Sequence, residues 1–138
     1  MKVAVLDDND GILEMYRDYL GKFNIELYNN LQSFESMFFD QFDVIVIAHR
    51  INGTSWKSVY DDLKSQALFI VTATFPPSNY KDSYPGLYRD ITREIAKHKK
   101  VLFKLKSEYE GILKLIEDKA QEKDIRELTR KITLDYCY

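Results

Sequence analysis

Two runs that are apolar throughout constrain the fold of this chain more than any other feature. They are VIVI at residues 44–47 and LFIV at residues 68–71. A strand with one face in water alternates apolar and polar residues, whereas a strand covered on both faces is continuously apolar. We therefore predict that these two runs form the central strands of a parallel sheet that carries helices on both faces.

Three further apolar runs, at residues 3–6, 25–28 and 101–103, add strands on either side, and the segments between them have helical spacing. Strands that alternate with helices are typical of an α/β protein built from βα units. Four helices are predicted in these segments. The first has an apolar stripe of Ile12, Tyr16, Tyr19, Leu20 and Phe23, and the second is a short helix capped by Ser33 that carries Phe34, Met37 and Phe38. The third follows the loop RINGTSW, is capped by Thr54 or Ser55 and runs through Leu63, and the fourth has Leu87, Ile91 and Ile95 on one face.

The last third of the chain combines a loop with a long helix. Residues 74–83, TFPPSNYKDS, carry two prolines and are expected to form an exposed loop. Ser107 and Glu110 form a capping-box pattern that opens the last helix. Residues 118–138 contain neither Gly nor Pro and keep helical spacing at Ile125, Leu128 and Ile132. We predict one domain over residues 1–117, with residues 118–138 as its helical extension.

Composition argues against several classes of partner. The formal charge of −2 over 138 residues gives no general attraction to nucleic acid, and the run KHKK at residues 97–100 is expected to be a solvated helix end. No apolar stretch approaches the roughly 20 residues that span a membrane, and no leader peptide is recognised. Since Cys137 is the single cysteine, no disulfide forms within the chain, and we expect a cytoplasmic protein.

The residues at the carboxyl ends of the predicted strands include several polar side chains. In open parallel sheets, ligands sit outside the carboxyl ends of the strands, so the residues there are the candidate site. These residues are Asp7 and Asp8 after the first strand, Ala48 and His49 after the third, Thr72 and Ala73 after the fourth, and Lys104 after the fifth.

Residues 1–117 resemble the receiver domains of bacterial response regulators. The matching motifs are VAVLDDND, FDVIVIAHRING, LFIVTA and VLFKLKSEYEGIL. The resemblance implies a flavodoxin-like (βα)5 three-layer sandwich with a five-stranded parallel sheet of order 2-1-3-4-5. It also implies that Asp7 and Asp8 help to hold magnesium, that Thr72 contacts a phosphoryl oxygen, and that Lys104 pairs with an acyl phosphate.

The chain departs from the receiver pattern where the reaction takes place. The position of the phosphoacceptor carboxylate is Ala48, whose methyl group cannot form an acyl phosphate. Leu105 follows the lysine where receivers have proline, Val101 replaces the aromatic residue of the fifth strand, and Asn52 stands in place of a proline. Without the third carboxylate we expect magnesium to bind weakly or not at all. No other cofactor and no small-molecule substrate is predicted.

These observations predict a pseudo-receiver, a non-enzymatic regulatory module that binds a protein partner without phosphorylation. The acids are then remnants, with Asp8, Asn9 or Asp10 capping the first helix and Lys104 serving as counterion to the aspartates. The candidate partner-binding residues are Tyr80, Tyr84, Tyr88 and Val101, although the tyrosines could equally pack the loop down. Homodimerisation through residues 118–138 is a further hypothesis.

An enzymatic alternative starts from the same acids. DNDG at residues 8–11, followed by Ile12 and Leu13, also resembles the nucleophile motif of haloacid-dehalogenase-type phosphatases. That resemblance implies Asp8 as nucleophile, Asp10 as general acid/base, and Thr72 and Lys104 as the next motifs. Against it, Ile12 replaces the motif threonine and no acidic pair ends a strand after Lys104. A phosphohistidine at His49 is disfavoured because successive strand residues point to opposite faces.

Overall fold

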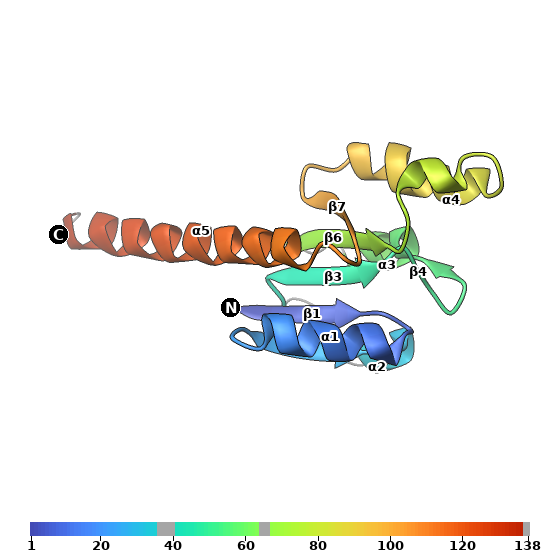
Figure 1. Ribbon diagram of the computed structural model, residues 1–138. Coiled ribbons are helices and arrows are strands. Elements are labelled where there is room, and N and C mark those ends of the chain that lie inside the picture. Colours follow the sequence, from blue (N-terminus) through green and yellow to red (C-terminus); the bar gives the residue numbers. More distant parts are fainter. Residues whose placement is uncertain (36–40, 64–66, 137–138) are drawn as a thin grey trace.

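A computed structural model describes residues 1–35, 41–63 and 67–136. Five parallel strands form one sheet in the order β2-β1-β3-β6-β7 (Figure 1). In chain order these are the first to fifth sheet strands, so the predicted order 2-1-3-4-5 is confirmed. The strands are β1 (Lys2–Leu6), β2 (Asn24–Tyr28), β3 (Val44–Ala48), β6 (Leu68–Ala73) and β7 (Val101–Leu105).

Helices cover both faces of the sheet, which confirms the predicted three layers. Helices α1 and α5 pack on one face, and α2, α3 and the α4 region pack on the other. The helical elements are α1 (Asp10–Leu20), α2 (Leu31–Glu35), α3 (Trp56–Leu63), the 3-10 turn η2 (Pro77–Tyr80), α4 (Pro85–Arg89), the wider π turn η3 (Asp90–Glu94) and α5 (Tyr109–Tyr136).

Strand β3 shows why the central runs are apolar throughout. Val44 and Val46 pack into the cluster under α1 and α5, whereas Ile45 and Ile47 pack into the cluster under α2 and α3. All four side chains are fully buried. Because β3 lies between β1 and β6 and is covered on both faces, no position along it can be polar without losing contact with water.

Helix α5 has two parts with different surroundings. Ile112 and Ile116 are buried against the sheet, and Lys22 with Glu117 and Lys123 with Asp43 form ion pairs that tie the helix to the body. From residue 124 to residue 131 every side chain is exposed, and Figure 1 shows the helix extending away from the sheet. No helix among the described residues is long and apolar enough to cross a membrane.

The segment predicted as the loop RINGTSW is a hairpin instead. Strands β4 (Arg50–Ile51) and β5 (Thr54–Ser55) pair antiparallel. Asn52 and Gly53 both have positive φ, 49° and 83°, and such a two-residue turn matches the twist of paired strands. The predicted cap is confirmed, since Ser55 Oγ accepts a hydrogen bond of 3.3 Å from the Lys57 backbone N–H.

Two other predicted helix starts are shifted. Asn30, not Ser33, caps α2, because its side-chain oxygen accepts a hydrogen bond of 2.8 Å from the Ser33 N–H. Helix α5 begins after Glu108, one residue later than the predicted capping box, and the Glu108 carboxylate accepts from the Leu105 N–H at 2.8 Å. Met37, Phe38 and Cys137 lie outside the described residues.

The hairpin turn predicts a contrast between two glycines. A Cβ added at Gly53 or at Gly86 would meet no atom within 4 Å, but only Gly53 has a positive φ. Gly53→Ala should therefore lower the free energy of unfolding by about 1–2 kcal/mol through backbone strain alone. Gly86→Ala, in the first turn of α4, should be neutral or raise it by about 0.4–1 kcal/mol. Urea denaturation of both variants measures the difference, and equal effects would contradict the turn geometry.

Candidate functional site

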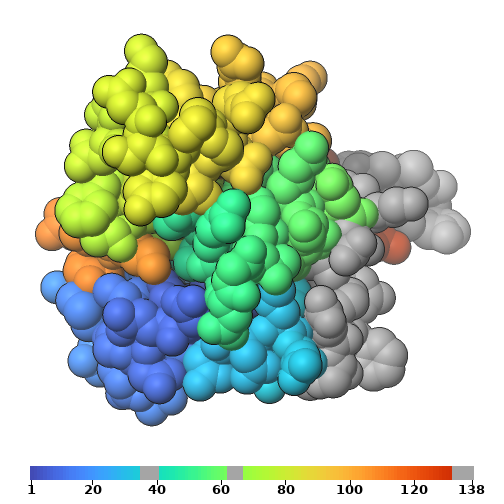
Figure 2. All heavy atoms as spheres, turned by 90° about the vertical axis from the view of Figure 1, so that its right-hand side faces the viewer, coloured from blue at the N-terminus to red at the C-terminus, as the bar shows by residue number. Residues whose placement is uncertain are grey.

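The candidate site lies at the edge of the sheet where the parallel strands end. Figure 2 shows this edge, with the β4–β5 hairpin between the N-terminal part of the chain and the segment that follows β6. Strand register places Ala48, Thr72 and Lys104 side by side on β3, β6 and β7. Asp7 follows the last residue of β1.

Asp7 is a buried carboxylate that forms an ion pair. Its side chain is 1% exposed. Oδ1 accepts a hydrogen bond of 2.9 Å from the Asn9 N–H. Oδ2 lies 2.8 Å from Lys106 Nζ and makes no other polar contact within the described residues. A buried carboxylate is tolerated only with a compensating charge, and Lys106 supplies it.

The lysine that pairs with Asp7 is not the one predicted. Lys104 Nζ lies 3.9 Å from the Glu108 carboxylate, and its side chain runs along α5 beside Gly111. The expectation that Lys104 neutralises the aspartates is therefore wrong. Strands β1 and β7 are separated by β3 and β6, and adjacent strands lie about 4.8 Å apart. The backbone of Lys104 is therefore about 14 Å from the β1 residue directly across the sheet. Lys106 follows the end of β7 and reaches across the strand ends.

Tyr16 and Thr72, together with the Asp7–Lys106 ion pair, form the buried cluster of the candidate site. Both are 1% exposed. The Tyr16 hydroxyl donates a hydrogen bond of 3.4 Å to the Lys106 carbonyl oxygen and is also hydrogen-bonded by the Thr72 side chain. Burial, and secondarily the charge of Asp7, raise the pKa of Tyr16 well above its usual range. The neutral Tyr16 hydroxyl therefore binds the backbone of Lys106, whose side chain pairs with Asp7.

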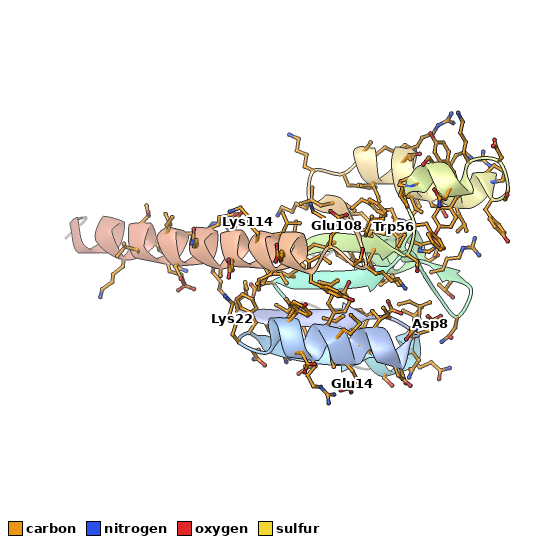
Figure 3. All side chains as sticks on the ribbon, in the orientation of Figure 1. Asp8, Glu14, Lys22, Trp56, Glu108 and Lys114 are labelled. Carbon is orange, nitrogen blue, oxygen red and sulfur yellow. The ribbon has the colours of Figure 1, made fainter. Side chains whose placement is uncertain are left out.

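The two remaining acids stabilise loops. Asp8 Oδ2 accepts a hydrogen bond of 3.0 Å from the Asn52 N–H, which ties the hairpin turn to the end of β1 (Figure 3). Asp10 Oδ1 accepts one of 3.2 Å from the Asn29 side chain. Of the predicted alternatives for the cap of α1, the structure selects Asn9, whose side-chain oxygen accepts from the Ile12 N–H at 3.2 Å.

His49 is directed toward the segment after β6. Its backbone N–H donates to the Thr72 carbonyl oxygen at 2.8 Å, and Nδ1 lies 3.3 Å from the same oxygen. The ring lies 5.7 Å from that of Tyr80, centroid to centroid. Burial lowers the pKa of His49, partly offset by its hydrogen bond to Thr72. These contacts give His49 a packing role between β6 and η2.

The residues present do not fit a magnesium ion. Asp7 already faces an ammonium group at 2.8 Å, Asp8 accepts from a backbone N–H, and Ala48 supplies no oxygen from its side chain. Magnesium requires several oxygen ligands in an octahedral arrangement. No group of three or more His, Cys, Asp or Glu side chains in the described part of the chain could hold a metal.

The four candidate partner-binding residues differ in exposure. Tyr80 packs against the core beneath the loop. Tyr84 is 59% exposed, and Tyr88 is half-buried. Val101 is only 3% exposed, so its side chain is not available to a partner, and the neighbouring Leu102 reaches the surface instead. Tyr80 therefore packs the loop onto the core, whereas Tyr84 is exposed enough to contact a partner.

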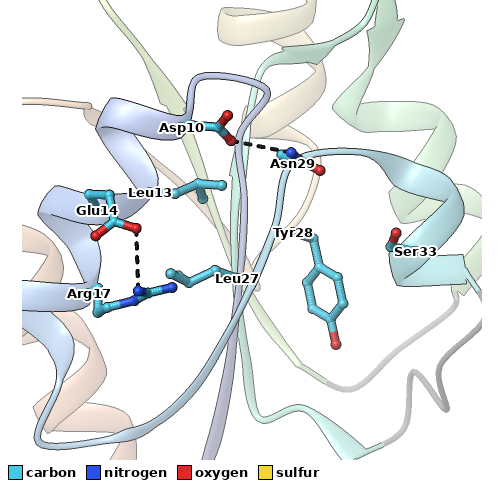
Figure 4. Close-up of a pocket in the computed structure, with 8 residues that line it drawn as sticks. All are labelled: Asp10, Leu13, Glu14, Arg17, Leu27, Tyr28, Asn29 and Ser33. Carbon is cyan, nitrogen blue, oxygen red and sulfur yellow. Dashed lines mark hydrogen bonds and ion pairs between the residues drawn. The ribbon is translucent and has the colours of Figure 1, made fainter.

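A separate groove of about 450 Å³ opens between α1 and β2, away from the buried cluster (Figure 4). Arg17 lies 3.3 Å from Glu14 within it. The Asp10–Asn29 hydrogen bond closes one end. Arg17 and Glu14 are thus paired with each other, and Asp10 accepts a hydrogen bond from a neutral amide. The lining residues are Asp10, Leu13, Glu14, Arg17, Leu27, Tyr28, Asn29 and Ser33.

Sequence reasoning missed Lys106 and Tyr16. Lys104 and Lys106 alternate in the motif KLKS, so strand geometry places both on the same face and only the later one beyond the strand end. Tyr16 was recognised as part of an apolar stripe, and its hydroxyl gave no further signal. The alternating lysines were thus the one feature of the sequence that could have identified the counterion.

The buried pair predicts unequal effects of two similar substitutions. Lys106→Met leaves the Asp7 carboxylate buried without its partner and should lower the free energy of unfolding by about 3–5 kcal/mol. Lys104→Met removes only the 3.9 Å contact with Glu108 and should cost about 0–1 kcal/mol. Chemical denaturation of both variants tests the assignment, and a larger loss in Lys104→Met would contradict it.

Burial of Tyr16 predicts a loss of stability at high pH. Its pKa is raised in the folded state, so its contribution is fully present below the unfolded value of about 10 and is lost as the pH rises above it. Between pH 9 and 11.5 the wild-type protein should lose more unfolding free energy than Tyr16→Phe. Tyr84→Phe, at an exposed position, is the matched control and should follow the wild type. Parallel profiles for all three would contradict the buried position of Tyr16.

Comparison with known proteins identifies the fold. No protein-family model and no curated protein matches the sequence. Among solved structures, a response regulator receiver domain protein from Bacillus halodurans aligns with a TM-score of 0.58 and 12% identity over 76% of this chain and 83% of its own.

Two further structures are similar. A CheY-like receiver domain protein from Methanospirillum hungatei gives a TM-score of 0.60 and 12% identity over 91% of this chain and 97% of its own. A structure described as adenylate cyclase from Rhodopirellula baltica gives 0.67 and 14% over 95% of both chains. At these identities the likeness concerns the fold. The chain has the receiver-domain fold, with a buried Asp7–Lys106 ion pair at the edge where the receiver resemblance places phosphorylation chemistry.

Proposed function

We propose that this protein is a phosphorylation-independent pseudo-receiver that acts as a regulatory protein–protein interaction module in signal transduction. The proposal combines the receiver-domain fold with the chemistry of the strand ends. It also carries over the prediction that the protein is not an enzyme and acts without a cofactor.

The observation that carries the proposal is the Asp7–Lys106 ion pair beside Ala48. Phosphorylation of a carboxylate needs an acceptor oxygen, and Ala48 has none in its side chain. It also needs a divalent cation, held by carboxylates, to offset charge on the phosphoryl oxygens. The nearest acid, Asp7, is instead neutralised from within the chain at 2.8 Å. Both requirements are thus unmet in the resting structure.

The ion pair also opposes metal entry on energetic grounds. A metal ion that bound Asp7 would have to displace the Lys106 ammonium from a buried carboxylate. The metal would therefore gain only the difference between its own attraction to Asp7 and that of the ammonium group 2.8 Å away. Asp8 Oδ2 already accepts from the Asn52 N–H, which makes this carboxylate a weaker metal ligand. We infer that one conformation persists with or without magnesium.

A partner-binding surface replaces the chemical switch in this proposal. Phe75 and Tyr84, on the segment after β6, are 53% and 59% exposed. Exposed aromatic side chains are enriched among the residues that dominate binding energy in protein interfaces. Tyr80 packs beneath them against the core and His49, which gives the segment a fixed support. This segment and α5 are the surfaces proposed to contact partners.

The proposal predicts that phosphoryl donors and their mimics leave the protein unchanged. Incubation with acetyl phosphate and magnesium should produce no added phosphate mass. Beryllofluoride with magnesium should cause no saturable shift in an amide NMR spectrum, since the acceptor is absent and Asp7 is paired. A receiver domain with an intact acceptor, treated in parallel, shows that the reagents are active.

Two outcomes would contradict this proposal in different ways. Phosphate mapped to Asp8, with turnover of a phosphate ester lost in Asp8→Asn, would favour the phosphatase interpretation. Phosphate mapped to His49 would favour phosphotransfer. Asp8→Asn tests the first outcome cleanly, because it retains a side-chain oxygen that can accept from the Asn52 N–H.

A further inference from the structure

The projecting part of α5 exposes an apolar stripe. Ile125 and Leu128 are 65% and 59% exposed, although both are large aliphatic side chains. They lie three residues apart in a continuous helix, and the sequence places Ile132 four residues further on. This spacing of three and then four residues is that of a helix that packs along another helix.

The stripe lies on the side of α5 that faces away from the sheet. Ile116 and Lys123 contact the body, and successive helical residues turn by about 100°. Leu128 is therefore rotated by roughly 140° from Lys123, and Ile125 by roughly 160°. The same outward side carries Lys114 and Asp118 where the helix lies on the sheet, and these two form an exposed ion pair at 3.6 Å. The outward side of α5 is therefore polar where the helix packs on the sheet and apolar where the helix projects beyond it.

We propose that a second copy of this chain covers the stripe in an antiparallel pair of α5 helices. The inference rests on the proposed interaction function and names the partner. In an antiparallel pair, Ile125 of one copy packs against Leu128 of the other, twice by symmetry, which forms an apolar centre.

Charge favours the second copy in this orientation. The positions that flank the apolar centre on one side are Asp124 and Lys131. In the antiparallel register above, Asp124 of each copy lies opposite Lys131 of the other, which gives two pairs of opposite charge. On the other side, Glu122 lies opposite Thr129, where no like charges meet.

A parallel pair is less favourable for the same residues. Like charges meet in both orientations, since a parallel pair places Asp118 opposite Asp118 and Lys114 opposite Lys114, and the antiparallel register, continued along the helix, places Asp118 opposite Asp135. In a parallel pair, however, Asp124 faces Thr129 and gains no partner of opposite charge. Among the residues whose side chains the structure describes, the antiparallel contact spans residues 122–131, about 15 Å of helix. A contact of this length predicts a monomer–dimer equilibrium that depends on concentration.

Sedimentation velocity over a concentration series tests the proposal with the full chain. The wild type should shift from monomer to dimer as concentration rises, and Leu128→Glu should remain monomeric. Arg130→Glu is the matched control, because position 130 is exposed on the same helix but outside the predicted contact. Circular dichroism verifies that each variant keeps its helices. A wild-type monomer at every concentration, or a dimer unaffected by Leu128→Glu, would overturn the proposal.

A charge exchange tests the orientation. Asp124→Lys should weaken association at least tenfold because it opposes Lys131 of the second copy, and the double variant Asp124→Lys/Lys131→Asp should restore it. In a parallel pair neither change would matter. Unchanged association in Asp124→Lys would overturn the antiparallel arrangement. Failure of the proposed function would appear separately, as phosphate incorporation or beryllofluoride-induced shifts in the monomeric Leu128→Glu variant.

Discussion

The rest of the candidate site depends on the ion pair between Asp7 and Lys106. A carboxylate that is 1% exposed cannot remain charged in the interior without a partner, and the ammonium group 2.8 Å away supplies one. The backbone around the pair is arranged to match it. The Lys106 N–H donates to the Ala73 carbonyl oxygen, the Tyr16 hydroxyl donates to the Lys106 carbonyl oxygen, and the Asn9 N–H donates to Asp7.

The same lysine connects the strand ends to the long helix. Lys106 follows β7, and α5 begins three residues later at Tyr109. The helix then runs without interruption past the sheet to the exposed stripe of Ile125 and Leu128. The ion pairs Lys22–Glu117 and Lys123–Asp43 hold its first part against the body. The helix that makes the proposed dimer contact thus begins three residues after the lysine that neutralises Asp7, and two other ion pairs hold its first part against the body.

The sequence predicted the architecture because burial on both faces leaves a direct trace in composition. The runs at residues 44–47 and 68–71 were the best candidates for central strands, and the βα alternation then indicates the layers. The site was predicted less completely. Asp7, Ala48 and Thr72 lie where expected because strand ends are easily located. The choice between Lys104 and Lys106 depended on how far a flexible side chain reaches across the sheet, and neither periodicity nor family resemblance encodes that distance.

The local errors have a common cause. The hairpin at Asn52 and Gly53 was predicted as a loop because its strands are only two residues long, too short for an alternating pattern. The Ser33 cap was displaced by the neighbouring Asn30 side chain, and α5 begins one residue later than the Ser107 capping box predicts, at Tyr109. Short-range signals of this kind compete within one or two residues, and packing decides between them.

A double-mutant cycle on Asp7 and Lys106 tests the central claim most directly. Asp7→Asn, Lys106→Met and the double variant are unfolded with urea, and their free energies are compared with the wild type. The account predicts that the double variant loses less stability than the sum of the single losses, by at least about 1 kcal/mol, because each single change leaves one uncompensated group. Additive losses would contradict a direct ion pair between the two side chains.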